Sequence, residues 1–69
     1  MITPFNYVLL LDTYEVGVVT PNIKDNLYEV DIYGIENTEI YHCCRRLCKE
    51  EELAIINETK FEKLLLGGK

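Results

Sequence analysis

The sequence predicts a single small, mainly β domain with a short helix at its C-terminal end. A segment near the middle of the chain, residues 27–33, alternates apolar and polar side chains in the way a half-buried strand does. β-Branched residues gather in short runs that loop-forming residues separate. The chain has 69 residues, enough to build one hydrophobic core but not two.

The first two strands are expected at residues 7–12 and 16–20. The longest apolar run of the chain opens the first strand and ends at Asp12, where a polar turn begins. The second strand is rich in valine and contains Gly17, which indicates a bulge or the close approach of another backbone. Residues 21–26 have the composition of a loop.

The third strand is expected at residues 27–33 because its alternation is strict. Alternate side chains of a strand point to opposite faces of the sheet, so Tyr28, Val30 and Ile32 should face the core. The side chains predicted on the outer face are Glu29, Asp31 and Tyr33.

A hairpin loop at residues 34–37 should lead into a fourth strand at residues 38–45. The register of this strand decides which side chains are buried, because a slip of one residue exchanges the two faces. We expect Ile40, His42 and Cys44 to point inward, since the other face would carry both Glu39 and Arg45.

A short fifth strand is expected at residues 53–56 and a helix at about residues 58–66. Asn57 or Thr59 can cap the helix, and Gly67 lies where a C-cap glycine belongs. The alternative is one long helix over residues 48–66, because the glutamates before the fifth strand also favour helix.

The order of these segments resembles that of small SH3-like barrel domains of bacteria and prophages. The resemblance covers about residues 5–57 and depends on Gly17-x-Val, the alternating segment 28–32 and a Glu-Leu pair before the last strand. It implies a five-stranded barrel followed by the short helix, all within one domain, residues 1–69. It also implies an adaptor or binding module, and no set of active-site residues carries over from it. Proline-rich peptide binders need an aromatic-lined groove, and this chain has no tryptophan to line one.

The charge of the chain is negative and unevenly distributed. The net charge is −5, and residues 1–44 hold seven acidic residues against one basic residue. Nucleic-acid binding depends on Lys and Arg that replace phosphate counterions, so direct nucleic-acid binding is not expected. A basic partner protein is favoured instead. No apolar run reaches the ~20 residues that cross a bilayer, so we expect a cytoplasmic protein without a membrane-spanning segment.

The cysteines raise one chemical alternative. Three cysteines, two of them adjacent, do not form a disulfide framework, and reduced thiols are the simpler expectation. His42, Cys44 and Cys48 could instead act as zinc or thiol ligands. Zinc needs a complete tetrahedral set of ligands, and no second Cys/His pair exists to complete it. We therefore expect no metal, no cofactor and no catalytic residue.

The leading hypothesis is a non-enzymatic, acidic protein-binding module, encoded by a phage or mobile element, that inhibits a basic host defence protein. Its partner-binding residues would form an outward stripe of tyrosines and carboxylates. The residues of this predicted stripe are Glu29, Asp31, Tyr33, Glu39 and Tyr41. Tyrosine is enriched at interfaces, and the carboxylates would steer a basic partner. The alternatives are a structural or immunity-type module, or a homodimeric adaptor.

Overall fold

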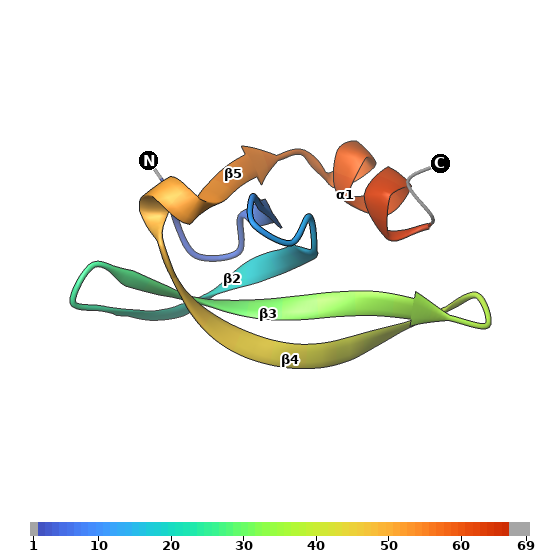
Figure 1. Cartoon of the computed structure of the whole chain (residues 1–69), viewed down its shortest axis with the longest axis horizontal. Helices are drawn as coiled ribbons and strands as arrows, with labels where there is room; N and C mark the ends of the chain where they lie inside the picture. Colours follow the sequence, from blue (N-terminus) through green and yellow to red (C-terminus); the bar gives the residue numbers. More distant parts are fainter. Residues whose placement is uncertain (1, 67–69) are drawn as a thin grey trace.

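Five antiparallel strands form one sheet, and a short helix follows the last of them. A computed structural model describes residues 2–66 of the chain (Figure 1). The elements, in chain order, are β1 (Tyr7–Leu10), β2 (Val16–Lys24), β3 (Leu27–Glu36), β4 (Glu39–Lys49), the 3₁₀ turn η1 (Glu50–Glu52), β5 (Leu53–Ile56) and α1 (Glu58–Leu65). The strand order is β4-β3-β2-β1-β5. The mainly β prediction with one C-terminal helix is therefore confirmed.

The loop predicted at residues 21–26 is wrong for most of its length. β2 continues through Pro21 to Lys24, and only Asp25 and Asn26 form the turn to β3. Both turn residues have positive φ angles, 52° and 63°, as a tight two-residue hairpin turn requires. Pro21 is tolerated within the strand because the β2–β3 pairing is irregular there, between Val19 and Ile23.

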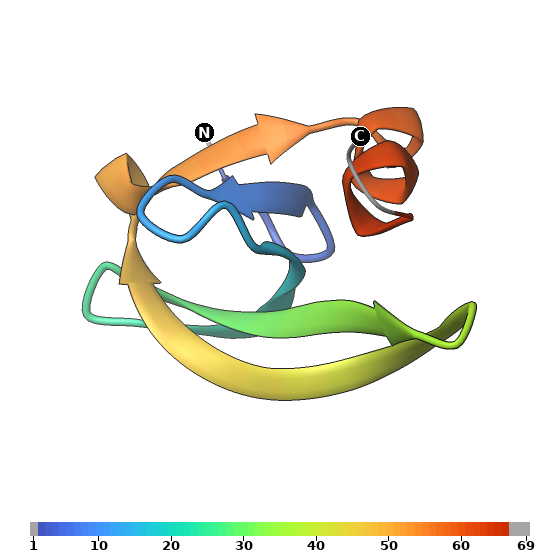
Figure 2. The same cartoon turned by 45° about the vertical axis from the view of Figure 1, so that its right-hand side comes forward.

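The β3–β4 hairpin is also longer than predicted. Its turn lies at Asn37 and Thr38, with φ angles of 53° and 66°, whereas residues 34–36 belong to β3. β4 extends to Lys49, beyond the predicted end at residue 45. Figure 2 shows the two long strands curving together along one side of the molecule. The hairpin therefore provides most of the length of the sheet.

The predicted register of β4 is wrong, and a bulge is the physical reason. Ile32 pairs with Cys44 but Tyr33 pairs with His42, so one residue of β4 has no partner at this point. The bulge moves Ile40 and His42 to the face opposite that of Cys44. All three predicted inward side chains are exposed, and Cys48 is the residue of β4 that reaches the core.

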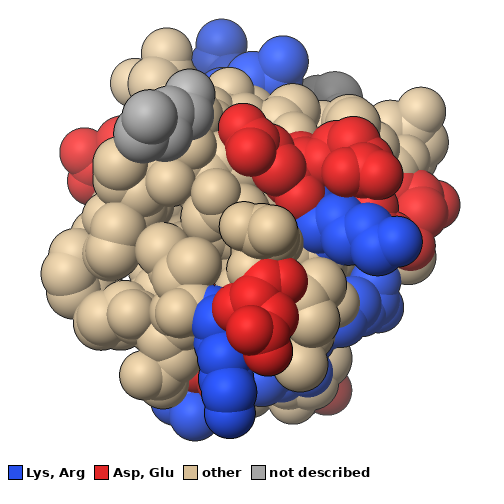
Figure 3. Space-filling model, turned by 90° about the vertical axis from the view of Figure 1, so that its left-hand side faces the viewer, with Lys and Arg blue, Asp and Glu red and all other residues tan. Residues whose placement is uncertain are grey.

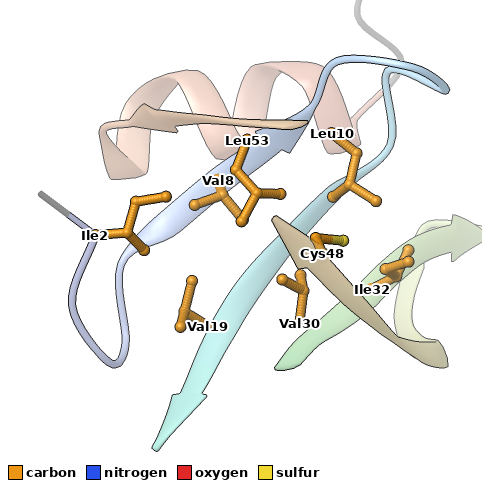
Figure 4. Packing of buried hydrophobic residues seen from close by; sticks show 8 residues of the cluster. All are labelled: Ile2, Val8, Leu10, Val19, Val30, Ile32, Cys48 and Leu53. Atoms are coloured by element: carbon orange, nitrogen blue, oxygen red, sulfur yellow. The ribbon is translucent and has the colours of Figure 1, made fainter. Parts of the chain in front are cut away.

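The main core lies on one face of the curved sheet. Its buried side chains come from all five strands and the N-terminal segment and converge in Figure 4: Ile2, Val8, Leu10, Val19, Val30, Ile32, Cys48 and Leu53. Val30 is fully buried, Ile32 is almost so, and the half-buried Tyr28 packs against this cluster. The inward face predicted for the third strand is therefore confirmed.

The helix α1 covers the other face of the sheet with a second cluster. Phe61 and Leu65 are its buried residues, and Val16 is the buried residue of the strands beneath it. The ring of Phe61 lies 4.6 Å from that of Tyr7, centroid to centroid. The unbroken apolar run of β1 is explained by this arrangement, because a strand covered on both faces loses its alternation.

Gly17 allows two strands to approach closely. A methyl group in place of its hydrogen would lie 2.5 Å from the carbonyl oxygen of Asp31 and 2.6 Å from a side-chain carbon of Val30. The close backbone approach predicted at Gly17 is therefore confirmed, whereas the irregularity of β2 lies further along the strand, after Val19.

The helix begins where the sequence predicts. The side chain of Asn57 accepts a hydrogen bond from the backbone N–H of Lys60 at 2.8 Å, which caps the first turn. The alternative of one helix over residues 48–66 is wrong, because β4, η1 and β5 occupy its first part. The C-cap predicted at Gly67 lies outside the described residues. Within residues 2–66, no helix has the length and apolar character needed to cross a membrane.

Candidate protein-binding surfaces

The structure divides the predicted stripe between the two faces of the sheet. Glu29, Asp31 and Tyr33 share one face of β3, as expected. Tyr41 pairs with Gly34 and Glu39 pairs with Glu36, so these two side chains of β4 lie beyond the bulge on the opposite face. The five residues therefore do not form one continuous surface.

Glu29 is held by neighbouring polar side chains. Its carboxylate Oε1 accepts a hydrogen bond from the Thr20 hydroxyl at 2.8 Å and another from the Asn22 amide at 3.2 Å. These two hydrogen bonds lower the pKa of Glu29. The carboxylate therefore stays ionised, but it already has two donors from β2 and is half-buried.

Asp31 is the centre of a small charged cluster with Arg45 and His42. Its Oδ1 accepts a hydrogen bond from Arg45 Nε at 2.6 Å, and His42 Nε2 lies 3.1 Å from the same oxygen. The hydrogen bond to Asp31 raises the pKa of Arg45. The negative charge of Asp31 is therefore compensated from β4, so this part of the face is not a free anionic patch.

Tyr33 is half-covered by the helix. Its ring lies 6.4 Å from that of Phe61, edge to face, and 5.6 Å from the imidazole of His42. It belongs to the second hydrophobic cluster, so much of its apolar area is already buried. The alternation of β3 indicates its face correctly but carries no information that the helix covers that face.

Tyr41 is more available than Tyr33. It is 46% exposed, and its phenol ring lies over Gly34, where a methyl group would be 2.9 Å from the hydroxyl oxygen. A glycine beneath an aromatic ring on a neighbouring strand is a common way of packing a sheet surface. Tyr41 therefore shields the backbone of β3 while one side of its ring faces solvent.

The structure does not bring the candidate metal ligands together. Cys44 and Cys48 lie four residues apart on one strand, which corresponds to about 13 Å. His42 lies on the opposite face and contacts Asp31. Two ligands of one zinc ion must lie within about 5 Å of each other, since each is about 2.3 Å from the metal. Among the described residues, no three His, Cys, Asp or Glu side chains gather as a metal site.

The surface that sequence reasoning missed is a shallow hollow at one end of the molecule, between the β2–β3 turn and η1. It has a volume of about 270 Å³. We call it the acidic hollow, and its lining residues are Asp25, Asn26, Leu27, Tyr28, Lys49, Glu50 and Glu51. It is just below the ~300 Å³ at which pockets for drug-sized ligands begin, so it suits a single side chain better than a small molecule.

The charges around the acidic hollow differ from those of the predicted stripe. Asp25, Glu50 and Glu51 are exposed and have no ion pair among residues 2–66, where the ion pairs are formed by other carboxylates. Lys49 is the one basic residue of the lining. Figure 3 views the molecule from the end of the β2–β3 turn and η1, and it shows acidic side chains in separate groups with basic side chains beside them. In the sequence, the run of three glutamates before β5 is the local sign of this acidic surface, but we interpreted it only as support for the alternative of one long helix.

Glu52 is the member of this glutamate run that has a structural role. Its carboxylate accepts a hydrogen bond from the backbone N–H of Lys49 at 2.7 Å, which fixes the start of η1. The other two glutamates point into solvent from a turn whose geometry is thus set. The turn brings Glu50 and Glu51 into the lining of the hollow together with Leu27 and Tyr28.

No protein-family model, curated protein or solved structure matches this chain.

Proposed function

We propose that the protein is a non-enzymatic binding module that takes a basic segment of a partner protein at the acidic hollow. The observation that carries the proposal is the arrangement of three unpaired carboxylates around half-buried apolar residues. A Lys or Arg side chain can place its methylene stem along the apolar part of the lining and its charge near the carboxylates.

The partner is a basic protein, as the net charge of the chain predicts, but it binds at the acidic hollow and not at the predicted stripe. Two of the three carboxylates of the predicted stripe, Glu29 and Asp31, are engaged by Thr20 and Arg45, whereas Asp25, Glu50 and Glu51 of the hollow have no such partners among the described residues. Rim charges act mainly on the rate of association and on specificity. The hollow is therefore a docking point for one basic side chain within a wider protein contact.

We further propose that the protein is encoded by a phage or mobile element and inhibits a basic host protein in the cytoplasm. What supports this finer statement is the net charge of −5 on a chain of 69 residues. A small acidic protein can occupy the nucleic-acid site of a basic protein through charge complementarity. The partner is then a nucleic-acid-binding protein, while the chain itself does not bind nucleic acid.

We also propose that the fold is an SH3-like barrel. The five-stranded meander supports this, because β5 returns to pair with β1 after a 3₁₀ turn. Cys48 at the end of β4 and Leu53 of β5 belong to the same core cluster although their strands form opposite edges of the sheet. The sheet thus curls around a single core.

The experiment that tests the site measures binding of a fluorescent peptide of alternating lysine and alanine by anisotropy. The double variant Glu50→Lys/Glu51→Lys should weaken binding by roughly 2- to 30-fold, since exposed ion pairs contribute about 0.2–1 kcal/mol each. The control is Glu58→Lys/Glu62→Lys, which makes the same change of charge on exposed positions of α1. Equal losses in both variants would show that net charge alone attracts the peptide, and the proposed site would be wrong.

A further inference from the structure

β4 is a long strand with one free edge. Ten of its eleven residues pair with β3, and no other strand within residues 2–66 pairs with it. Figure 2 shows β4 at the outside of the molecule, with no element along its outer edge. An edge strand presents unpaired backbone N–H and C=O groups, which are a template for another strand.

The charged side chains that usually protect such an edge are directed elsewhere. Arg45 is bound to Asp31 of β3, and Arg46 reaches Glu15 at 3.2 Å and Asp12 at 3.6 Å in the β1–β2 loop. These contacts draw both guanidinium groups across the faces of the sheet instead of along its edge. Basic side chains and bulges are common devices against strand pairing, so in the middle of β4 only the bulge is left in place, and Lys49 lies at the end of the strand.

Two exposed apolar side chains flank the bulge symmetrically. Ile40 is 57% exposed and Leu47 is 59% exposed. They pair with Ile35 and Glu29 of β3, two residues that share one face, so Ile40 and Leu47 also share one face of β4. Both lie at the same distance in sequence from the point between Cys43 and Cys44.

We propose that two copies of the chain associate by antiparallel pairing of β4 with β4 about a two-fold axis between Cys43 and Cys44. This register places Ile40 opposite Leu47 of the second copy, twice in the dimer. A two-fold interface is self-complementary by symmetry, and an apolar cross-strand pair is its usual stabilising unit.

The bulge is what makes this register possible. In this register, each residue lies opposite a residue of the second copy, and their two numbers add up to 87. Because 87 is odd, one number is even and the other is odd, and in a regular strand such residues point to different faces of the sheet. The extra residue at the bulge shifts this alternation by one, so that opposite residues of the two copies lie on the same face. Ile40 and Leu47 are on one face, and Tyr41 and Arg46 are on the other. The same register places Tyr41 opposite Arg46 of the second copy, on the face away from Ile40 and Leu47.

Charge also favours a second copy in this alignment. β4 begins at the acidic Glu39 and ends at the basic Lys49, so antiparallel pairing brings the acidic end of one strand beside the basic end of the other. The net charge of −5 on each copy opposes association over longer distances. Salt screens this repulsion, so the dimer should strengthen with salt, whereas peptide binding at the acidic hollow should weaken.

Sedimentation velocity tests the dimer. An edge-to-edge contact is smaller than a standard interface of ~1,600 Å², so we expect reversible dimerisation at roughly 0.1–1 mM chain. Ile40→Lys and Leu47→Lys should each remove the dimer. The control Ile55→Lys changes an apolar residue of β5, 49% exposed, and should leave it intact. A chain that stays monomeric at about 1 mM, or an equal effect of the control, would overturn the proposal.

Disulfide trapping tests the register. An oxidant, dioxygen with copper–phenanthroline, takes two electrons and two protons from a pair of thiols as the S–S bond forms. The register places Cys43 opposite Cys44 of the second copy, so the wild-type chain should cross-link, and Cys43→Ala or Cys44→Ala alone should cross-link much less. A mixture of the two variants should recover a cross-linked heterodimer. Equal cross-linking of either variant alone and of the mixture would refute the register.

Discussion

Replacing Val30 by alanine tests the packing of the sheet around its core. Val30 is fully buried in β3, between Val19 of β2 and the inner face of β4. The change removes two methyl groups, which costs about 1.6 kcal/mol of transfer free energy at about 0.8 kcal/mol each. A cavity on the order of 50 Å³ adds about 1 kcal/mol if the neighbours do not relax.

The expected loss for Val30→Ala is therefore about 2–3 kcal/mol. A chain of this length has a total stability of about 3–10 kcal/mol, so the loss is a large share of it. The melting temperature should fall by roughly 10–20 °C, measured by circular dichroism. The matched control is Val18→Ala, a half-buried valine on the face beneath the helix, which should lose about half as much. A smaller loss at Val30 than at Val18 would refute the assignment of the main core.

Three further predictions concern other parts of the fold. Gly17→Ala should destabilise the domain by about 2 kcal/mol or more in urea unfolding, because the added methyl group meets the carbonyl oxygen of Asp31; an unchanged midpoint would contradict the close approach. In a thiol titration with an aromatic disulfide, two thiols per chain should react at once. Cys48, whose pKa burial raises, should react only after unfolding, and three fast thiols would contradict its burial. The pKa of Glu29 is lowered below its ordinary value of 4.5, so the stability that its hydrogen bond from Thr20 contributes is present above that pH and lost as the pH falls below it. The stability difference between the wild type and Thr20→Val should therefore shrink from pH 6 to pH 3, and a constant difference would count against this bond.

The parts of the fold that local patterns determine were predictable. The alternation of residues 28–32 gives the correct faces for β3, and Asn57 marks the start of the helix. Gly17 correctly indicated a close approach, although not the location of the irregularity in β2. Each of these patterns depends only on a few residues that are neighbours in the sequence, so it can be recognised without the structure.

The parts that depend on pairing between distant residues were not predictable. A single bulge at Cys43 reversed the faces of Ile40 and His42, and nothing in the local sequence of β4 marks it. The predicted stripe failed as one surface for the same reason. The ion pairs of Arg45 and Arg46 likewise join residues that lie far apart in the chain.

The acidic hollow shows the same limit at the level of the site. Asp25 and Glu50 are 25 positions apart in the sequence, and the β2–β3 turn and η1 bring them to one rim. Leu27 and Tyr28 read as ordinary strand residues in the sequence. Their role in lining a surface hollow follows from where β4 ends and turns.

The central claim is that a basic partner binds at the acidic hollow, and amide chemical-shift mapping by NMR tests it most directly. The ¹⁵N-labelled chain is titrated with the lysine–alanine peptide at low salt and at a chain concentration of about 0.05 mM, below the expected dimer range. We predict that the largest shifts fall on residues 25–28 and 49–51, and that they disappear in Glu50→Lys/Glu51→Lys. Largest shifts on α1, or on Glu29 and Asp31 of β3, would contradict the account.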